Sequence, residues 1–265
     1  MTAHPLARPT TAPEAGPAPI RAADTAHLRD ANTAHLRDAD TAHLRDANTA
    51  HLRDAIQHAA CGLVPYRHAV LQNVLPARLA ADLRALAYAP SPPDGSGTRA
   101  GANASRIFGN PEAQASHRAW ACLAAMFQNP EIGAALAALS GATLSGSFLR
   151  IEYCLDTEGF WLEPHTDIGD KLFTLVLSLS DQPGAEAWGT DILYPDGRLA
   201  TRIQARPNSA LVFAPAPDTW HGFARRPIHG IRRTLIVNYV RPVWRARHEL
   251  CFPDQPLTIT ASART

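Results

Sequence analysis

Lysine is nearly missing from the sequence, and neither sign of charge is in excess. Lys171 is the one lysine, and the chain balances 25 basic residues against 24 acidic ones. A net charge of +1 provides no basic face that would hold a nucleic acid or an anionic membrane. We therefore expect neither as a partner, and the sequence leaves the oligomeric state open.

Paired cysteines and long apolar runs are also lacking. The four cysteines form no C-x-x-C motif, which excludes a zinc knuckle and a thioredoxin-like site, and their scatter does not suggest a disulfide scaffold. No stretch approaches the roughly 20 apolar residues of a membrane-spanning helix, and residues 1–20 lack the apolar core of a secretion signal. We expect a cytoplasmic location.

An octapeptide repeat stands out among the features that are present. It follows a tail rich in Pro, Ala and Thr over residues 1–21, which we expect to be disordered. The unit T-A-H-L-R-D-A-x begins at Thr25, Thr33, Thr41 and Thr49. On a helix, positions eight apart drift by about 80° and lie about 12 Å apart, so the leucines form no straight seam and the histidines cannot share a metal. We interpret residues 22–60 as a helical or disordered linker, with an interaction arm or a loose metal-binding tract as alternatives.

The folded domain is predicted over residues 61–245, with a tail over 246–265. Apolar spacing predicts helices at residues 76–88, 117–127 and 132–139. Later, short segments between Gly, Pro and Asp predict strands. These strands cover residues 148–154, 172–179, 191–194, 199–204, 210–214 and 234–240. Helices followed by antiparallel strands indicate a mainly β fold of the α+β class, with helices on one face of a sandwich or barrel.

The motif Pro-His-Thr-Asp at residues 164–167 is the first candidate for chemistry. In an extended segment, His165 and Asp167 present an imidazole and a carboxylate on the same side. His221, shortly after a predicted strand, can supply a second imidazole, and His229 is an alternative by residue type only. Two histidines and one carboxylate on one face of a metal leave positions for a bidentate cosubstrate and O₂, as in non-haem Fe(II) oxygenases.

The last predicted strand carries an arginine on what would be its inner face. Arg232, Thr234, Ile236 and Asn238 alternate along that face. An inward arginine is costly unless it meets an anion. A dicarboxylate would supply one, held bidentately by the guanidinium with help from the Thr234 hydroxyl. A shift of one residue in the strand register would put Arg233 there instead.

The order of these motifs, H-x-D, a second His and then G-x-R-x-T, resembles the Fe(II)/2-oxoglutarate-dependent dioxygenase superfamily, and within it the prolyl-4-hydroxylase-like branch. Tyr153 resembles the family's cosubstrate-contacting tyrosine, and segments 188–194 and 207–213 resemble family strands in the expected order. Thr190 and Ala210 depart from this pattern because they stand where glycine is usual.

The resemblance covers residues 63–245 and implies a double-stranded β-helix, or jelly-roll, core. It implies Fe(II), 2-oxoglutarate and O₂ as reactants, with ascorbate as a reductant. The implied reaction hydroxylates an unactivated C–H bond of a small molecule, amino acid or peptidyl side chain and releases succinate and CO₂. The residues implied at the iron, as the catalytic centre, are His165, Asp167 and His221, and those implied at 2-oxoglutarate are Arg232, Thr234 and Tyr153.

Four residues near the proposed iron site in the sequence are candidates for substrate contact, namely Trp161, Lys171, Trp220 and Asn238. Lys171 could equally be a surface cation, and Trp220 could pack the barrel wall. Two other functions compete: a cupin-like metalloenzyme that does not use 2-oxoglutarate, and a non-catalytic interaction protein with a degenerate barrel. Arg232 argues against the first, and the complete set of ligand types argues against the second.

Overall fold

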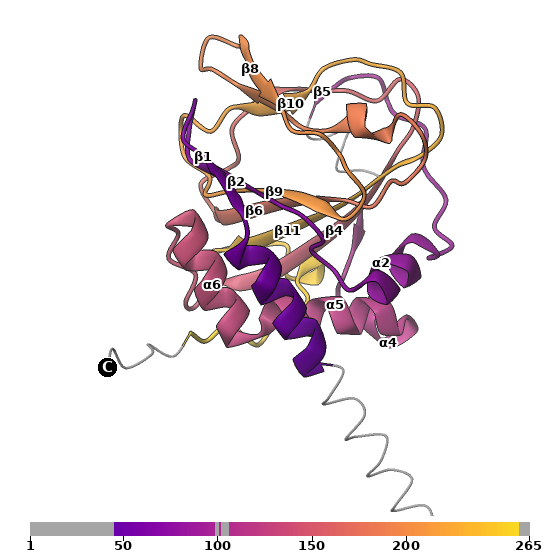
Figure 1. Cartoon of the computed structure of the whole chain (residues 1–265). Coiled ribbons are helices and arrows are strands. Elements are labelled where there is room, and N and C mark those ends of the chain that lie inside the picture. The colour runs from indigo at the N-terminus through magenta and orange to yellow at the C-terminus, as the bar shows by residue number, and fades with distance from the viewer. Residues whose placement is uncertain (1–44, 99–100, 102–105, 260–265) are drawn as a thin grey trace, which may run out of the picture. The chain divides into compact units, whose positions relative to one another are not determined.

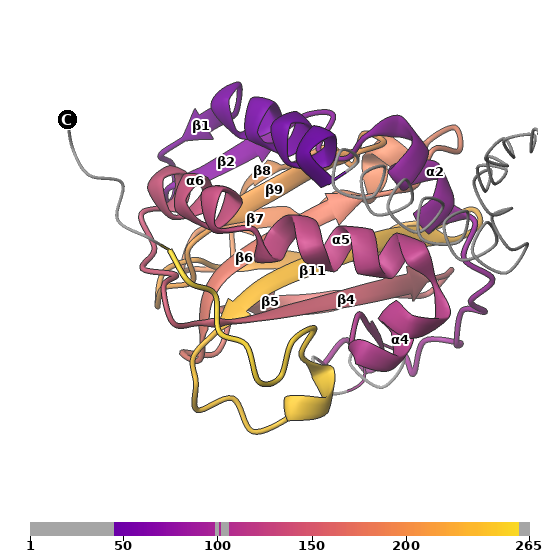
Figure 2. The ribbon, with the colours of Figure 1, turned by 90° about the horizontal axis from the view of Figure 1, so that it is seen from below.

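The structure is a computed structural model that describes residues 45–98, 101 and 106–259. The predicted disordered tail and the first two repeats lie outside the described residues. The described chain forms two antiparallel sheets with helices against one of them (Figures 1 and 2). Among the helices of this part, none is long and apolar enough to cross a membrane.

The larger sheet has seven strands, and its centre is formed by the longest ones. In spatial order the strands are β1 (Ala60–Gly62), β2 (His68–Leu71), β9 (Ser209–Phe213), β6 (Lys171–Ser178), β11 (Arg232–Val240), β4 (Phe148–Asp156) and β3 (Ile107–Phe108). The register between β11 and β4 runs from Arg232 opposite Asp156 to Val240 opposite Phe148. Even-numbered residues of both strands therefore share one face of the sheet.

The smaller sheet has four strands, β5 (Leu162–His165), β10 (His221–Phe223), β7 (Asp191–Leu193) and β8 (Leu199–Arg202), in that spatial order. From β4 to β11 the chain passes back and forth between the sheets, with β4, β6, β9 and β11 in the larger one and β5, the β7–β8 pair and β10 in the smaller one. The smaller sheet faces the larger one (Figure 1). This alternation is a double-stranded β-helix, so the predicted fold class is confirmed.

The helices cover the other face of the larger sheet (Figures 1 and 2). They are residues 45–57, α2 (Ala77–Arg84), α4 (Pro111–Ser116), α5 (Arg118–Gln128) and α6 (Pro130–Ser140), with the 3₁₀ turns η1 (Ala185–Trp188) and η2 (Arg247–Glu249) elsewhere. The Asn129-Pro130 pair both separates α5 from α6 and starts α6. The Asn129 side chain accepts a hydrogen bond from the backbone of Glu131, and Pro130 fills the first helical turn.

The last octapeptide repeat takes part in the main hydrophobic core. Residues 45–57 are helical, and Leu52 and Ile56 are buried in the cluster that fills the space between the helices and the larger sheet. Ile56 stands where the earlier repeats have Asn or Asp, so this repeat alone has an apolar pair four residues apart. Leu257 joins the same cluster. The core thus includes residues that precede and residues that follow the predicted domain 61–245 in the sequence.

Candidate metal centre

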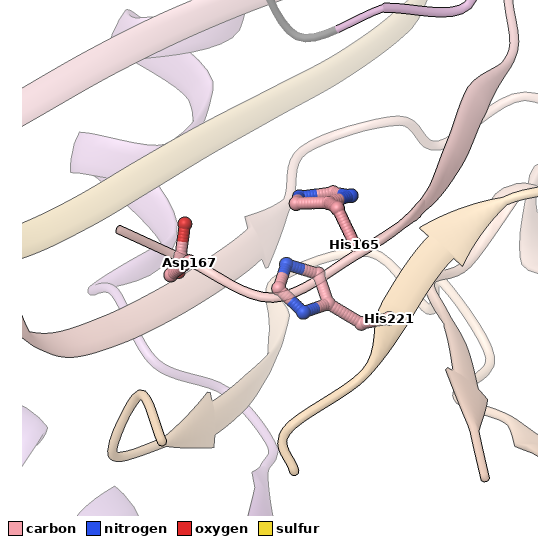
Figure 3. A group of neighbouring side chains, drawn as sticks. All are labelled: His165, Asp167 and His221. Carbon is pink, nitrogen blue, oxygen red and sulfur yellow. The ribbon is translucent and has the colours of Figure 1, made fainter. Parts of the chain in front are cut away.

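Three of the predicted site residues converge between the two sheets (Figure 3). His165 ends β5 and lies opposite His221, the first residue of β10, and Asp167 follows two residues after His165. The candidate ligand atoms of the three side chains all lie within 4.8 Å of one another. His229 is exposed and is not part of this group. Cross-strand pairing is therefore what joins the two distant histidines.

Both imidazoles are oriented by backbone carbonyl groups. Nδ1 of His165 lies 2.8 Å from the Glu163 carbonyl oxygen, and Nδ1 of His221 lies 2.9 Å from that of Thr219. A carbonyl oxygen can only accept, so each Nδ1 carries the proton and donates it. In a neutral ring this tautomer puts the lone pair on Nε2, the atom that can bind a metal.

The Asp167 carboxylate is held by two side chains. Lys171 Nζ donates to Oδ1 at 2.8 Å, and Thr174 Oγ1 donates to Oδ2 at 2.7 Å. Burial alone would raise the pKa of this carboxyl, but the charges of Lys171 and His221 and the two hydrogen bonds lower it well below its usual range. Asp167 is therefore ionised. Two imidazole nitrogens and one carboxylate oxygen form a donor set that fits Fe(II).

The three side chains line a cavity of about 390 Å³ together with Arg232 and Thr234 of β11. Arg232 is buried, donates from Nε to the Trp188 carbonyl oxygen at 2.8 Å and forms an ion pair with Asp156. Arg233 is on the opposite face of the strand and does not line the cavity. Arg232, and not Arg233, thus faces the cavity.

Tyr153 is the one predicted cosubstrate contact that the structure contradicts. Its side chain is fully buried on the helix-covered face of β4, where its ring contacts Tyr88 and Trp120. Its hydroxyl donates to the Leu83 carbonyl oxygen at 3.1 Å, and burial raises its pKa to about 12. Odd-numbered residues of β4 face the helices, so Tyr153 cannot reach the cavity.

The four candidates for substrate contact are placed differently from one another. Lys171 lines the cavity, although its ammonium group is paired with Asp167. Trp161, Trp220 and Asn238 do not line it. Trp161 stacks against Arg225, the Trp220 carbonyl accepts a hydrogen bond from the Tyr66 hydroxyl, and Asn238 is fully buried beside Thr174. Only Lys171 thus remains as a direct contact for a molecule in this cavity.

Sequence reasoning missed a group of buried charged residues on one wall of the cavity. This wall is formed by β4 and by Arg106, the residue that precedes β3. Arg106 lies 3.6 Å from Glu152 and 3.7 Å from Asp156. Arg150 pairs with Glu152 and lies 2.5 Å from Glu249. The signal was the alternation along β4, where residues 150, 152 and 156 share the face opposite Tyr153.

Comparisons with known proteins agree with this architecture. No protein-family model matches the sequence, and no curated protein matches it either. A solved structure of a prolyl-4-hydroxylase from Pseudomonas putida is 15% identical, with a TM-score of 0.52, over 72% of this chain and 98% of that one.

Two further structures are similar more loosely. A prolyl 4-hydroxylase from Phytophthora capsici is 12% identical with a TM-score of 0.49, over 74% of this chain and 65% of that one. The alpha-ketoglutarate-dependent epimerase SnoN of nogalamycin biosynthesis is 18% identical with a TM-score of 0.45, over 83% and 98%. Neither likeness is close enough to support an inference.

The similarity to the Pseudomonas putida enzyme is one of fold, because its sequence identity is low. This similarity in fold agrees with two observations on the chain itself. The strands are divided between two sheets that the chain visits in turn, and the H-x-D motif converges with a distant histidine. The chain therefore has the double-stranded β-helix fold of the Fe(II)/2-oxoglutarate oxygenases, with a candidate facial triad at His165, Asp167 and His221.

Proposed function

We propose that the protein is an Fe(II)- and 2-oxoglutarate-dependent dioxygenase that hydroxylates an unactivated C–H bond. The observation that carries this proposal is the placement of the triad in one cavity with Arg232 and Thr234. A triad alone would suit many metalloenzymes. A buried arginine and a hydroxyl on the same wall add a site for the far carboxylate of a dicarboxylate cosubstrate.

Two groups of residues have separate roles in this proposal, one at the metal and one at the cosubstrate. His165, Asp167 and His221 would hold Fe(II), while Arg232 and Thr234 would bind 2-oxoglutarate. With iron bound, oxidative decarboxylation of 2-oxoglutarate by O₂ supplies the oxidising power, and succinate and CO₂ are released. Phe160, Leu162 and Phe223 line the cavity with apolar surface, which excludes water from the reacting atoms.

Arg232 is already paired with Asp156, so its capacity to bind a carboxylate of 2-oxoglutarate has to be examined. Its Nε and one Nη1 hydrogen are engaged by Trp188 and Asp156, but a guanidinium has five N–H groups, so three can still serve a carboxylate. A cupin-like enzyme without this cosubstrate would need no such arginine in the cavity. The two candidate functions therefore differ in whether 2-oxoglutarate binds.

The first experiment measures 2-oxoglutarate binding calorimetrically to protein loaded with Mn(II), a redox-silent substitute for Fe(II). We expect Arg232→Gln to raise the Kd at least about tenfold, because a charge-assisted hydrogen bond is lost. Arg232→Lys should recover only part of the affinity, since the planar fork is missing. Arg198→Gln, on an exposed turn, is the matched control and should change nothing. An unchanged Kd in Arg232→Gln would remove Arg232 from this role.

The second experiment measures succinate formed from 2-oxoglutarate with Fe(II), O₂ and ascorbate. We expect slow formation without substrate in the wild type and none above background in His221→Ala or Asp167→Ala. Binding of Mn(II) without any binding of 2-oxoglutarate would favour the metalloenzyme that does not use this cosubstrate. Absence of metal binding in folded protein would favour the non-catalytic alternative.

A further inference from the structure

The charged wall of the cavity is more extensive than metal and cosubstrate require. Arg106, Arg150, Glu152 and Glu249 all line the cavity, and the first three have side chains no more than 5% exposed. Burying charged groups is costly, even in pairs. The observation to explain is therefore a set of buried charged side chains that is not part of the candidate metal-binding triad.

The charges of the cavity are balanced. Its four cationic side chains face three carboxylates of the lining and Asp156, which pairs with Arg232 and Arg106. Fe(II) and the 2-oxoglutarate dianion would add charges that cancel. A substrate with one net charge would leave that charge uncompensated in a buried site, whereas a zwitterion or a neutral molecule would not. The cationic side chains are Arg106, Arg150, Lys171 and Arg232, and the lining carboxylates are Glu152, Asp167 and Glu249.

Two buried donors on this wall have no hydrogen-bond partner within the described structure. They are Nε of Arg106 and Nε1 of Trp244, and both residues line the cavity. The Arg106 side chain is 5% exposed, and its Nε lies 3.6 Å from Glu152, too far for a hydrogen bond. Buried donors are nearly always satisfied, so both call for an acceptor from a ligand. A carboxylate is the acceptor best suited to a guanidinium.

Acceptors for a cation lie beside these donors. Glu152 contacts both Arg106 and Arg150, and Glu249 contacts Arg150. The Arg150 guanidinium is stacked against the rings of Phe108 and Trp244, which fixes its position. The same wall thus has donors that could bind the carboxylate of a ligand and glutamate side chains that could bind its ammonium group.

This wall is connected to the metal centre through hydrogen bonds. Arg150 Nη1 lies 3.4 Å from Oδ1 of Asn238, whose Nδ2 donates to Thr174 Oγ1 at 2.9 Å. Thr174 in turn donates to the metal ligand Asp167. The wall and the triad line the same cavity, so a molecule anchored at the wall would share that cavity with the candidate metal site.

We propose that the cavity binds the zwitterionic end of a free α-amino acid, with the carboxylate at Arg106 and Trp244 and the ammonium group at Glu152 and Glu249. The proposal rests on the proposed function and names the class of substrate that is hydroxylated. It selects the free amino acid over a residue within a peptide, because the two peptide bonds of such a residue remove its ammonium charge and its carboxylate charge.

The experiment titrates the standard L-amino acids into protein loaded with Mn(II) and 2-oxoglutarate, with heat of binding as the readout. Each amino acid that binds is compared with its amine, which lacks the carboxylate, its deaminated acid, and its N-acetyl amide, which mimics a peptide residue. We expect at least one amino acid to bind and all three analogues to bind at least about tenfold more weakly.

The sharpest variant is Trp244→Phe, which removes the indole N–H and keeps a ring against Arg150. We expect it to weaken the amino acid about tenfold and to leave unchanged both the Kd of 2-oxoglutarate and that of the amine analogue. Arg106→Gln should also weaken binding of the amino acid, with its fold checked by circular dichroism. Arg198→Gln is again the control.

The possible failures can be told apart. If 2-oxoglutarate binds but no amino acid does, or if any analogue matches its amino acid, the zwitterion site is overturned and the proposed function stands. The titrations are repeated without 2-oxoglutarate. If that cosubstrate does not bind, the proposed function fails, and amino-acid binding to the Mn(II) form still decides the present inference.

Discussion

At the scale of single residues, the Thr174 hydroxyl group is one of two groups that orient the candidate ligand Asp167. Thr174 Oγ1 donates to Asp167 at 2.7 Å and accepts from Asn238 at 2.9 Å. Thr174 is buried and lines the cavity beside Asp167. Groups that orient metal ligands commonly contribute as much to metal affinity as some ligands do.

We expect Thr174→Val to weaken Mn(II) binding about 10-fold to 100-fold, because Asp167 loses the donor that fixes its second oxygen. The measurement is a Mn(II) titration followed by electron paramagnetic resonance. Thr201→Val on β8 is the matched control, since Thr201 is exposed. Equal affinity in Thr174→Val and wild type would show that Lys171 alone positions the carboxylate.

Residue type and spacing were sufficient to predict that His165, Asp167 and His221 converge and that Arg232 faces the cavity, but not where Tyr153 lies. A strand exposes alternate residues on opposite faces, so the parity of a position decides which side it occupies. Tyr153 is odd-numbered on β4 and faces the helices, while Arg150 and Glu152 are on the opposite face of the strand and line the cavity. The resemblance to a family tyrosine ignored this parity.

At the scale of elements, the candidate metal centre depends on two very short strands. β5 and β10 bring His165 opposite His221, yet they have four and three residues. Such segments are too short to show alternation, and the sequence analysis did not predict them as strands. Gly222 lies at their contact, where an added Cβ would be 2.9 Å from the Leu162 carbonyl oxygen.

We expect Gly222→Ala to lower the free energy of unfolding by about 1–3 kcal/mol and to weaken Mn(II) binding, since the added methyl group pushes β5 and β10 apart. Urea denaturation and the Mn(II) titration measure the two effects. Gly169→Ala is the control, because a Cβ there meets no atom within 4 Å. If both variants behave alike, the close approach at Gly222 is unimportant.

Asp191 of β7 stabilises the strand that carries His221. It accepts hydrogen bonds from Arg202, Arg226 and the backbone of Ala224. Burial alone would raise the pKa of this carboxyl, but these hydrogen bonds lower it below its usual value. A carboxyl whose pKa is lowered by folding stabilises the folded state above the pKa of the unfolded chain, about 3.9.

Asp191→Asn should therefore lower the free energy of unfolding at pH 7 by about 1–3 kcal/mol. The difference from wild type should shrink below about pH 4, as protonation removes the same contribution from the wild type. Urea denaturation across this pH range measures it, with the exposed Asp254→Asn as control. A difference that stayed constant down to the lowest pH at which the protein folds would contradict an electrostatic role.

At the scale of the whole molecule, the core extends beyond the segment that sequence analysis assigned to the domain. Leu52 from the last repeat is fully buried and Leu257 is 1% exposed, both in the same cluster. A repeat with one leucine in eight residues gives little sign of burial. Its contribution depends on Ile56 and on the position of the helix 45–57 against the larger sheet.

Truncation of Leu52 tests how much the helix 45–57 contributes to the stability of the fold. We expect Leu52→Ala to lower the free energy of unfolding by about 2–5 kcal/mol, because a cavity is left in the core. Leu63→Ala is the matched control, since Leu63 is 74% exposed, and it should change the value by less than about 0.5 kcal/mol. A small effect of Leu52→Ala in urea denaturation would mean that the helix is not needed for the stability of the fold.

The sequence by itself determined the order of H-x-D, second histidine and arginine, the helices before the strands, and the alternation that put Arg232 and Thr234 on one face. These are local properties, because spacing along a regular element decides which side a residue occupies. The tertiary structure decided which histidine lies opposite His165 and which residues join the charged wall. Arg106 and Trp244 line the same cavity from distant segments, and the pairing of distant segments depends on the packing of the whole fold rather than on any local pattern.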